Sequence, residues 1–257
     1  MTEVSLKELI SAGAHFGHQT RRWNPKMKPY LYDAKEGVHI FDLAQTKIKL
    51  EEALEVLKKY AKEGKSILFV GTKKQAKEMV RELAEGTGSF YVNERWLGGA
   101  LTNFDYIKRS TKKLQELKAG LAEGKFNDRT KRERLLIERE MRRLERFFGG
   151  IETMTKIPDL MVVIDTKKER TAVKEALATG VEIMGLVDSN SDPTQIDYPI
   201  PMNDDATRAL EYVLSLMEEA ILEGKRKTQS YDKLKIDPER SRTGQDSKLK
   251  TEASKKS

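Results

Sequence analysis

The stretch SILFVG at Ser66–Gly71, together with LMVVID at Leu160–Asp165, decides the fold of this chain. A third run of the same kind is IMGLVD at Ile183–Asp188. Each run is short, nearly continuous in apolar residues and free of polar alternation, which is typical of parallel strands covered on both faces. The three runs therefore predict neighbouring strands of a buried parallel sheet.

Helical patterns follow two of these strands. Thr72 is expected to cap one helix, and Thr166 precedes another. Strands that alternate with helices in this way indicate an α/β fold with a doubly wound, mostly parallel sheet of the Rossmann or flavodoxin type. Weaker strand candidates are Val38–Phe41 and Phe90–Val92.

Two further helices are expected beside the sheet. Asp42 can cap the first, and the pair Asp204 and Asp205 begins the second. The second helix is expected to end near Gly224, because glycine is a common stop signal. Beyond that point the chain has few apolar residues, many lysines and serines and no periodicity, so residues 225–257 are predicted to form a disordered basic tail.

The segment between Asn103 and Phe148 departs from this alternation of strands and helices. Apolar residues recur there at spacings of three and four on both sides of a turn at Gly124–Thr130. The spacing predicts an antiparallel helical hairpin, a short coiled coil with a narrow apolar seam, that projects from the domain. The expected organisation is an α/β domain over residues 1–102 and 149–224, with the hairpin inserted at 103–148.

Charge is segregated along the chain, although its net value is only +7. Residues 107–148 hold 14 basic and 7 acidic side chains, whereas residues 149–224 hold 6 basic and 15 acidic ones. Local fields of this kind, rather than net charge, draw polyanions to one surface. The hairpin is thus a candidate for binding nucleic acid. The simpler alternative is that each charged block is merely solvated.

The N-terminal stretch AGAHFGHQTRRWNPKMKPYLY, residues 12–32, is a second basic element. Arginine and lysine can neutralise phosphates, and aromatic rings can stack on unpaired bases. Pro25 and Pro29 interrupt helices, so we expect an ordered loop that displays its cations. In the alternative interpretation, Trp23 and Tyr30 pack under the edge of the core and the cations are only solvated.

A third candidate element is YVNERWLGGALTNF at Tyr91–Phe104. Trp96 is expected to be a buried anchor at the base of the hairpin, while Arg95 fits a structural role and an RNA-binding role equally well. Together the three elements supply the candidate RNA-binding residues Arg21, Arg22, Trp23, Lys26, Lys28, Arg95, Lys108, Arg109, Lys112, Lys113, Arg132, Arg139, Arg142 and Arg143.

No catalytic constellation emerges from the sequence. The chain has no cysteine, which excludes thiol nucleophiles, disulfides and thiolate metal sites. The run VGTKKQA lacks the spacing of a phosphate-binding loop, and there is no G-x-G-x-x-G fingerprint. His15, His18 and His39 offer too few ligands, without a firm geometric link, for a zinc site. We therefore expect no cofactor, no metal and no small-molecule substrate.

A cytoplasmic location without membrane contact is also expected. No apolar run approaches the length that a membrane-spanning helix needs. The start MTEVSLKELI does not have the basic cluster and apolar core of a signal peptide.

Six motifs in sequence order resemble those of one protein family. They are AGAHFGHQTRRWNPKM, GVHIFDLAQT, FVGTKKQA, NERWLGGALTNF, IPDLMVVID and IDYPIPMNDDA. Over about Leu6–Leu222 they are similar to the bacterial ribosomal protein S2 family, with DSNSDP at Asp188–Pro193 as a small departure from the DTNCDP that is common there. The resemblance implies a non-catalytic structural constituent of the small ribosomal subunit in translation. It also implies contact with ribosomal RNA and with neighbouring small-subunit proteins, including ribosomal protein S1.

Two other functions fit the same residues. A Rossmann-like nucleotide-binding enzyme would have a cofactor pocket at the carboxyl ends of the strands, and its fold alone does not imply its function. A coiled-coil protein-interaction module would keep its partner at elevated salt and after ribonuclease treatment. Contacts to RNA phosphates would weaken under the same conditions.

Overall fold

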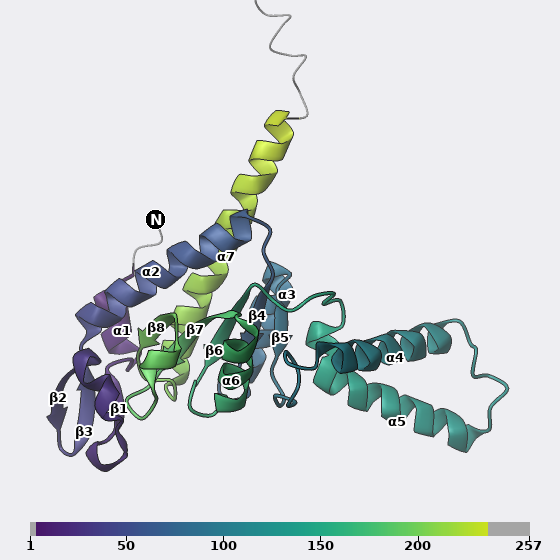
Figure 1. Cartoon of the computed structure of the whole chain (residues 1–257), viewed down its shortest axis with the longest axis horizontal. Helices are drawn as coiled ribbons and strands as arrows, with labels where there is room; N and C mark the ends of the chain where they lie inside the picture. Colours follow the sequence, from purple (N-terminus) through teal and green to yellow (C-terminus); the bar gives the residue numbers. More distant parts are fainter. Residues whose placement is uncertain (1–3, 236–257) are drawn as a thin grey trace, which may run out of the picture.

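The computed structural model describes residues 4–235, which form an α/β protein around a five-stranded parallel sheet (Figure 1). In spatial order the strands are β5 (Phe90–Val92), β4 (Ile67–Val70), β6 (Leu160–Ile164), β7 (Glu182–Val187) and β8 (Tyr198–Pro201). The first strand of this sheet, β4, lies inside it, with β5 on one side and the later strands on the other, which is the flavodoxin type of order. The predicted fold class is therefore confirmed, and β8 is a strand that the sequence did not predict.

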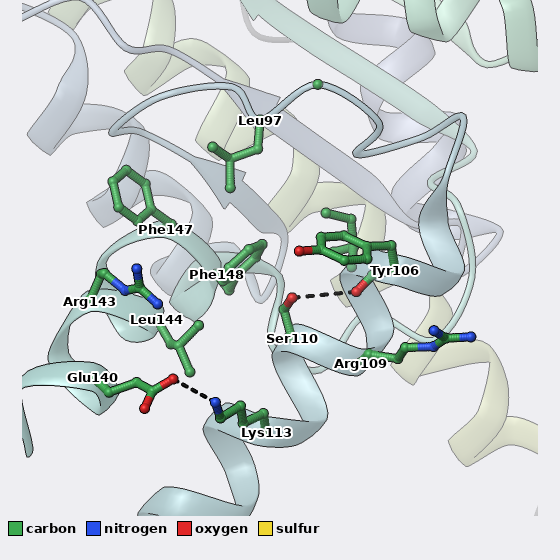
Figure 2. Close-up of a pocket in the computed structure, with 12 residues that line it drawn as sticks. Leu97, Tyr106, Arg109, Ser110, Lys113, Glu140, Arg143, Leu144, Phe147 and Phe148 are labelled. Atoms are coloured by element: carbon green, nitrogen blue, oxygen red, sulfur yellow. Dashed lines mark hydrogen bonds and ion pairs between the residues drawn. The ribbon is translucent and has the colours of Figure 1, made fainter. Parts of the chain in front are cut away.

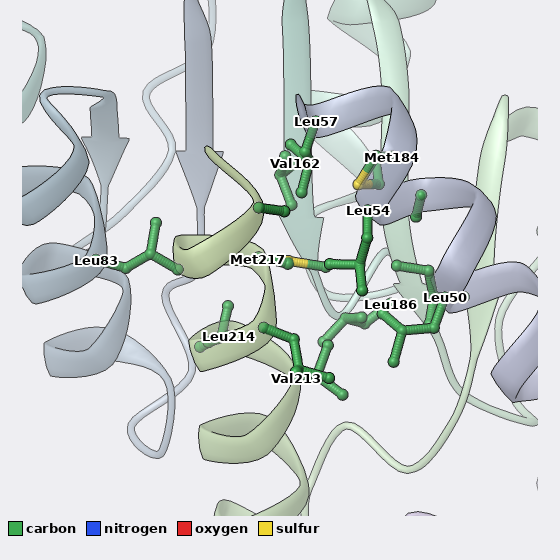
Figure 3. Close-up of a cluster of buried hydrophobic side chains, with 14 of the residues drawn as sticks. Leu50, Leu54, Leu57, Leu83, Val162, Met184, Leu186, Val213, Leu214 and Met217 are labelled. Atoms are coloured by element: carbon green, nitrogen blue, oxygen red, sulfur yellow. The ribbon is translucent and has the colours of Figure 1, made fainter. Parts of the chain in front are cut away.

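The apolar runs are continuous because both faces of the sheet are buried. In β4, Ile67 and Phe69 belong to one hydrophobic cluster, and Leu68 and Val70 belong to the other. The first face is covered by α2 (Leu43–Lys62), α3 (Lys77–Thr87) and α7 (Thr207–Lys235), and the second by α6 (Arg170–Thr179) and the base of the hairpin. Figure 3 shows the first cluster, in which side chains of α2 and α7 pack against those of β6 and β7.

The N-terminal residues form a second, antiparallel sheet after the short helix α1 (Leu6–Ser11). Its strands lie in the order β1 (Phe16–Gln19), β3 (Val38–Phe41) and β2 (Leu31–Lys35), and the 3₁₀ helices η1 (Thr20–Arg22) and η2 (Pro25–Tyr30) connect β1 to β2. Glu36 and Gly37 have φ of 52° and 77° and close the β2–β3 hairpin, as a two-residue type I′ turn requires. The weaker strand candidate Val38–Phe41 is thus a strand, but of this second sheet.

The predicted antiparallel helical hairpin is confirmed. It consists of α4 (Phe104–Ala122) and α5 (Lys131–Phe148) and extends away from the β5 end of the parallel sheet (Figure 1). At its base, Ile107 and Phe148 join the second hydrophobic cluster, and the buried Leu114 continues the seam outward.

The predicted helix starts have mixed outcomes. Asp42 caps α2 as expected, because its carboxylate accepts two backbone N–H groups, at 2.9 and 3.4 Å. The prediction for Thr72 is wrong. Its hydroxyl donates to the carboxylate of Glu169, and α3 begins only at Lys77.

The predicted end of the last helix near Gly224 is also wrong, because α7 continues to Lys235. Gly224 is buried where α7 crosses α2, and a Cβ at this position would lie 2.4 Å from the carbonyl oxygen of Lys58 and 2.9 Å from Cβ of Ala61. The glycine therefore permits close helix packing and is not a stop signal. The rest of the predicted disordered tail, residues 236–257, lies outside the described residues.

We expect Gly224→Ala to destabilise the protein by about 1 kcal/mol, because overpacking costs about 2 kcal/mol and alanine regains only roughly 1 kcal/mol of helix propensity. Gly86→Ala in α3 is the matched control. Gly86 is exposed, and its new Cβ would meet only the flexible end of the Glu218 side chain. Urea unfolding should therefore show Gly86→Ala at or above the wild-type stability, and equal losses in both variants would contradict the packing role of Gly224.

Candidate RNA-binding surfaces

Hydrogen bonds fasten the N-terminal sheet to the chain that follows β7 and β8. The backbone N–H of His18 donates to Oγ of Ser189 (2.7 Å), and that of Asn24 donates to the carbonyl oxygen of Ser189 (2.8 Å). After β8, the backbone N–H of Asn203 donates to the carbonyl oxygen of Ala14 (3.0 Å). The 3₁₀ helices with the predicted cations are thereby fixed relative to the parallel sheet.

Four of the predicted cations lie on these 3₁₀ helices. Arg21, Arg22 and Lys28 are exposed, and none of the three has a carboxylate at ion-pair distance among the side chains of residues 4–226. Lys26 differs, because its Nζ lies 2.6 Å from Asp192 and 3.2 Å from Oγ1 of Thr194. Nε of Arg21 donates only to the neutral amide oxygen of Gln19, at 3.0 Å. The three cations without a carboxylate partner are consequently better placed than Lys26 to receive a phosphate.

Trp23 is half-buried, and its ring centroid lies 4.8 Å from that of His39. Tyr30 is also half-buried and packs against the second hydrophobic cluster. These contacts agree with the alternative in which both aromatic residues pack against the fold. An RNA-stacking role for Trp23 stays a prediction.

Ion pairs link the two helices of the hairpin to each other and the base of the hairpin to the α/β domain. Across the two helices, Nζ of Lys113 lies 2.5 Å from Glu140. At the base, Glu94 after β5 accepts hydrogen bonds from Lys77 of α3 and from Arg146 of α5, the latter at 2.8 Å. The bonds from Lys77 and Arg146 hold the pKa of Glu94 below its ordinary value, so this link is ionised at neutral pH.

The exposed face of α5 carries a stripe formed by Arg132, Arg139 and Arg143, here called the arginine stripe. Spacings of seven and four residues place the three on one side of the helix over about 16 Å. In the described part of the chain, no carboxylate lies at ion-pair distance from any of them. By contrast, Lys112 and Arg142 pair with glutamates one turn along their own helices, at 3.9 and 3.3 Å.

The remaining predicted residues of α4 lie near the base of the hairpin. Arg109 is exposed and has no carboxylate at ion-pair distance among the described residues. Nζ of Lys108 lies over the ring of Phe104, 5.1 Å from its centroid.

Arg95 is exposed on a loop that folds around the buried carboxylate of Glu175. The indole N–H of Trp96 and the backbone N–H of Gly99 donate to Oε1 at 3.1 and 2.8 Å, and the backbone N–H of Leu101 donates to Oε2 at 3.0 Å. Trp96 is only 7% exposed, which confirms the predicted buried anchor. Sequence analysis missed Glu175, although its carboxylate organises the whole loop.

The structure does not bring the predicted residues into one patch. The N-terminal sheet lies beyond β8 and the hairpin beyond β5, at opposite ends of the parallel sheet (Figure 1). The chain therefore presents two separate basic surfaces, which can contact two different segments of one folded RNA.

An acidic cluster lies at the carboxyl ends of the parallel strands. Nζ of Lys73 lies 2.6 Å from both Asp204 and Asp205 and 3.1 Å from Asp165. Burial disfavours the charged form of Lys73, but the carboxylates outweigh it and raise the pKa of Lys73 above its ordinary value. The prediction that Asp204 and Asp205 begin the last helix is wrong, because they bind Lys73 and α7 starts at Thr207.

This cluster occupies the switch point of the sheet, where ligands bind in many folds of this type. Burial, together with Asp165 and Asp188, raises the pKa of Asp204 well above its ordinary value. Such an excess of carboxylates repels phosphate groups, so the geometry does not favour the nucleotide-binding enzyme.

Of the three histidines weighed as metal ligands, His18 alone joins a group of converging ligand atoms among the described residues. One atom each of His18, Asp188 and Asp205 lie within 4.8 Å of one another. In that same part of the chain, Nδ1 of His15 and Nε2 of His39 are buried without a hydrogen-bond partner. The three histidines therefore do not form one site, and the expectation of no metal stays a prediction.

Within residues 4–235, no helix is both long enough and apolar enough to cross a membrane. A family model described as ribosomal protein S2 matches residues 9–224. The match includes the parallel sheet, both basic surfaces and the entire hairpin, and so covers most of the chain.

Proposed function

Since the chain belongs to the ribosomal protein S2 family and is a structural protein of the small ribosomal subunit in translation, we propose that it binds small-subunit ribosomal RNA and has no catalytic role. The exposed cations on η1, η2, α4 and α5 that have no carboxylate at ion-pair distance among the described residues carry this proposal. Such cations contact mainly phosphates, which fix position without reading base sequence. Recognition then rests on the folded shape of the RNA.

The separation of the two basic surfaces supports a bridging role. Helix α5 has 18 residues and therefore spans about 27 Å, so the hairpin reaches well beyond the sheet that supports it. We propose that the hairpin and the N-terminal 3₁₀ helices hold two RNA segments at a fixed separation. The division into an α/β domain (1–102 and 149–224) and an inserted hairpin (103–148) is part of the same proposal.

The acidic segment of the chain, residues 149–224, points to protein partners. Residues 149–224, with 15 acidic and 6 basic side chains, are proposed to face away from RNA and toward basic neighbouring proteins of the subunit. Ribosomal protein S1 is the further partner that the family resemblance implies. Membership of the family supports the expected cytoplasmic location on the ribosome. The absence of a cofactor, a membrane and a small-molecule substrate stays a prediction.

Incorporation into subunits tests this orientation. We expect the double variant Arg21→Glu/Arg22→Glu to lose at least about tenfold in affinity for protein-depleted small subunits, because two phosphate contacts become repulsive. The control Glu218→Lys/Glu219→Lys reverses the same number of charges on α7 and should stay within about twofold of the wild type. Sedimentation of tagged protein with the subunits measures both, and equal losses would contradict the proposed orientation.

A further inference from the structure

The root of the hairpin and the loop before it enclose a pocket of about 580 Å³ (Figure 2). This volume falls within the range of pockets that bind small molecules. The pocket opens between α4 and α5, beside the loop that Glu175 organises, and its walls include Leu97, Tyr106, Arg109, Arg143, Phe147 and Phe148.

The inner wall of the pocket is apolar and belongs to the core. Ile107, Leu144 and Phe148 are buried in the second hydrophobic cluster and present one side to the pocket. Tyr106, in contrast, is 62% exposed. Figure 2 shows its ring reaching from α4 into the same space as Phe148, beneath Leu97. An aromatic ring so exposed beside an apolar wall offers a stacking face to a planar group.

The rim of the pocket is positively charged. Arg109 on α4 and Arg143 on α5 are exposed, and neither has a carboxylate at ion-pair distance within the described residues. The single carboxylate among the lining residues, that of Glu140, is neutralised by Lys113 at 2.5 Å. A pocket with an apolar wall and two free guanidinium groups suits a ligand that combines a flat ring with phosphates.

The arginine stripe indicates which ligand of this kind reaches the pocket. Arg143 is both the last member of the stripe and a lining residue of the pocket, so a phosphate backbone that follows the stripe along α5 arrives at the rim. This continuity favours a nucleotide within a polymer over a free nucleotide.

We propose that this pocket receives one unpaired nucleotide of ribosomal RNA, an inference that rests on the proposed RNA-binding function. Its base stacks on Tyr106 against the apolar wall, and its flanking phosphates bind Arg109 and Arg143. Unpaired bases that stack on aromatic side chains are the usual means by which proteins hold a defined point of a folded RNA. The pocket thus sets the position of the hairpin along the RNA. The arginine stripe alone would bind the phosphate backbone at any position.

Tyr106→Ala tests the proposal in the full-length chain. We expect an affinity for small-subunit ribosomal RNA lower by about tenfold to a hundredfold, with the slope of log affinity against log salt unchanged, because a stacking contact and no phosphate contact is lost. Tyr106→Phe keeps the stacking face and should bind as the wild type does. Since Tyr106 is 62% exposed, thermal unfolding should show both variants folded.

Base-specific chemical probing gives the second readout. We expect one unpaired base to be protected by the wild type and by Tyr106→Phe and to become reactive with Tyr106→Ala. If Tyr106→Ala binds and protects the RNA as the wild type does, the pocket proposal is overturned while RNA binding stands. If Tyr106→Ala leaves every base protection intact but abolishes binding of a neighbouring ribosomal protein, the pocket belongs to a protein partner and the proposal is also overturned. Failure of the wild type to bind the RNA would reject the proposed function itself.

Discussion

Replacing Glu175 by alanine is expected to lower the free energy of unfolding by about 3–5 kcal/mol, because several buried N–H donors lose their acceptor at once. The carboxylate accepts hydrogen bonds from Trp96, Gly99 and Leu101 at 2.8–3.1 Å, and also from the backbone and hydroxyl of Thr102, both at 3.3 Å. These donors belong to the loop that carries Arg95 and forms one wall of the pocket at the hairpin root. Urea unfolding monitored by far-UV circular dichroism measures the loss.

Two control variants separate the carboxylate from the rest of the helix. Lys174→Ala changes the exposed neighbour of Glu175 and should be nearly neutral. Glu175→Gln keeps the shape but turns an amide NH₂ toward backbone donors, so about 2 kcal/mol should be lost. A Glu175→Ala variant as stable as Lys174→Ala would contradict the organising role of this carboxylate.

The Glu175 carboxylate also determines how the stability of the protein should depend on pH. Burial opposes the ionisation of Glu175, but the hydrogen bonds from Leu101, Trp96 and Gly99 outweigh it and hold the pKa of Glu175 below its ordinary value. A folded-state pKa below the unfolded one gives stabilisation that is complete above the ordinary glutamate pKa of about 4.3 and is lost as pH falls through the folded value. The stability gap between the wild type and Glu175→Gln should therefore be constant near neutral pH and narrow only below about pH 4.

Neutralising the arginine stripe is expected to have the largest effect on RNA binding. In the triple variant Arg132→Gln/Arg139→Gln/Arg143→Gln, the plot of log affinity against log salt should become less steep. The magnitude of its negative slope should decrease by about 3, because each phosphate contact contributes about 0.9. The same counterion effect predicts a loss of roughly 500-fold in affinity at 100 mM salt, relative to a 1 M reference at which the effect vanishes. Filter binding to small-subunit ribosomal RNA across a salt series gives both quantities.

A matched control removes the same charge from the acidic segment, residues 149–224. The variant Lys156→Gln/Lys174→Gln/Arg208→Gln also loses three exposed cations, so any effect of net charge alone would be shared. It should keep the wild-type slope. Equal changes in the two triple variants would mean that the stripe has no special contact. If the chain instead associates with small subunits in a way that neither salt nor ribonuclease weakens, the coiled-coil protein-interaction module is favoured.

Local burial explains which strands could be predicted from the sequence. The strands β4, β6 and β7 were recognisable because burial of both faces leaves a continuous apolar run. The sequence of β8, YPIP, does not predict a strand, because Pro199 and Pro201 cannot donate backbone hydrogen bonds. Proline is tolerated there since β8 is the edge of the sheet.

The candidate site was predicted only in part, because some of its side-chain contacts join residues that are far apart in the sequence. The exposed arginines of α5 follow from helical spacing. The neutralisation of Lys26 by Asp192 joins residues that are 166 positions apart, which no local pattern reveals. Glu175 left a weak signal, a lone carboxylate on the apolar face of α6. Tyr106 left another, an aromatic residue three positions before Arg109 on an exposed helix face.

The central claim, that two separate basic surfaces contact ribosomal RNA, is tested most directly by ultraviolet crosslinking in small subunits assembled with the wild-type chain, followed by mass spectrometry of the crosslinked peptides. We predict RNA adducts on peptides from residues 16–30 and from residues 104–148, and few or none on peptides from residues 160–224. Adducts concentrated on residues 160–224, with both basic surfaces free of RNA, would contradict the account.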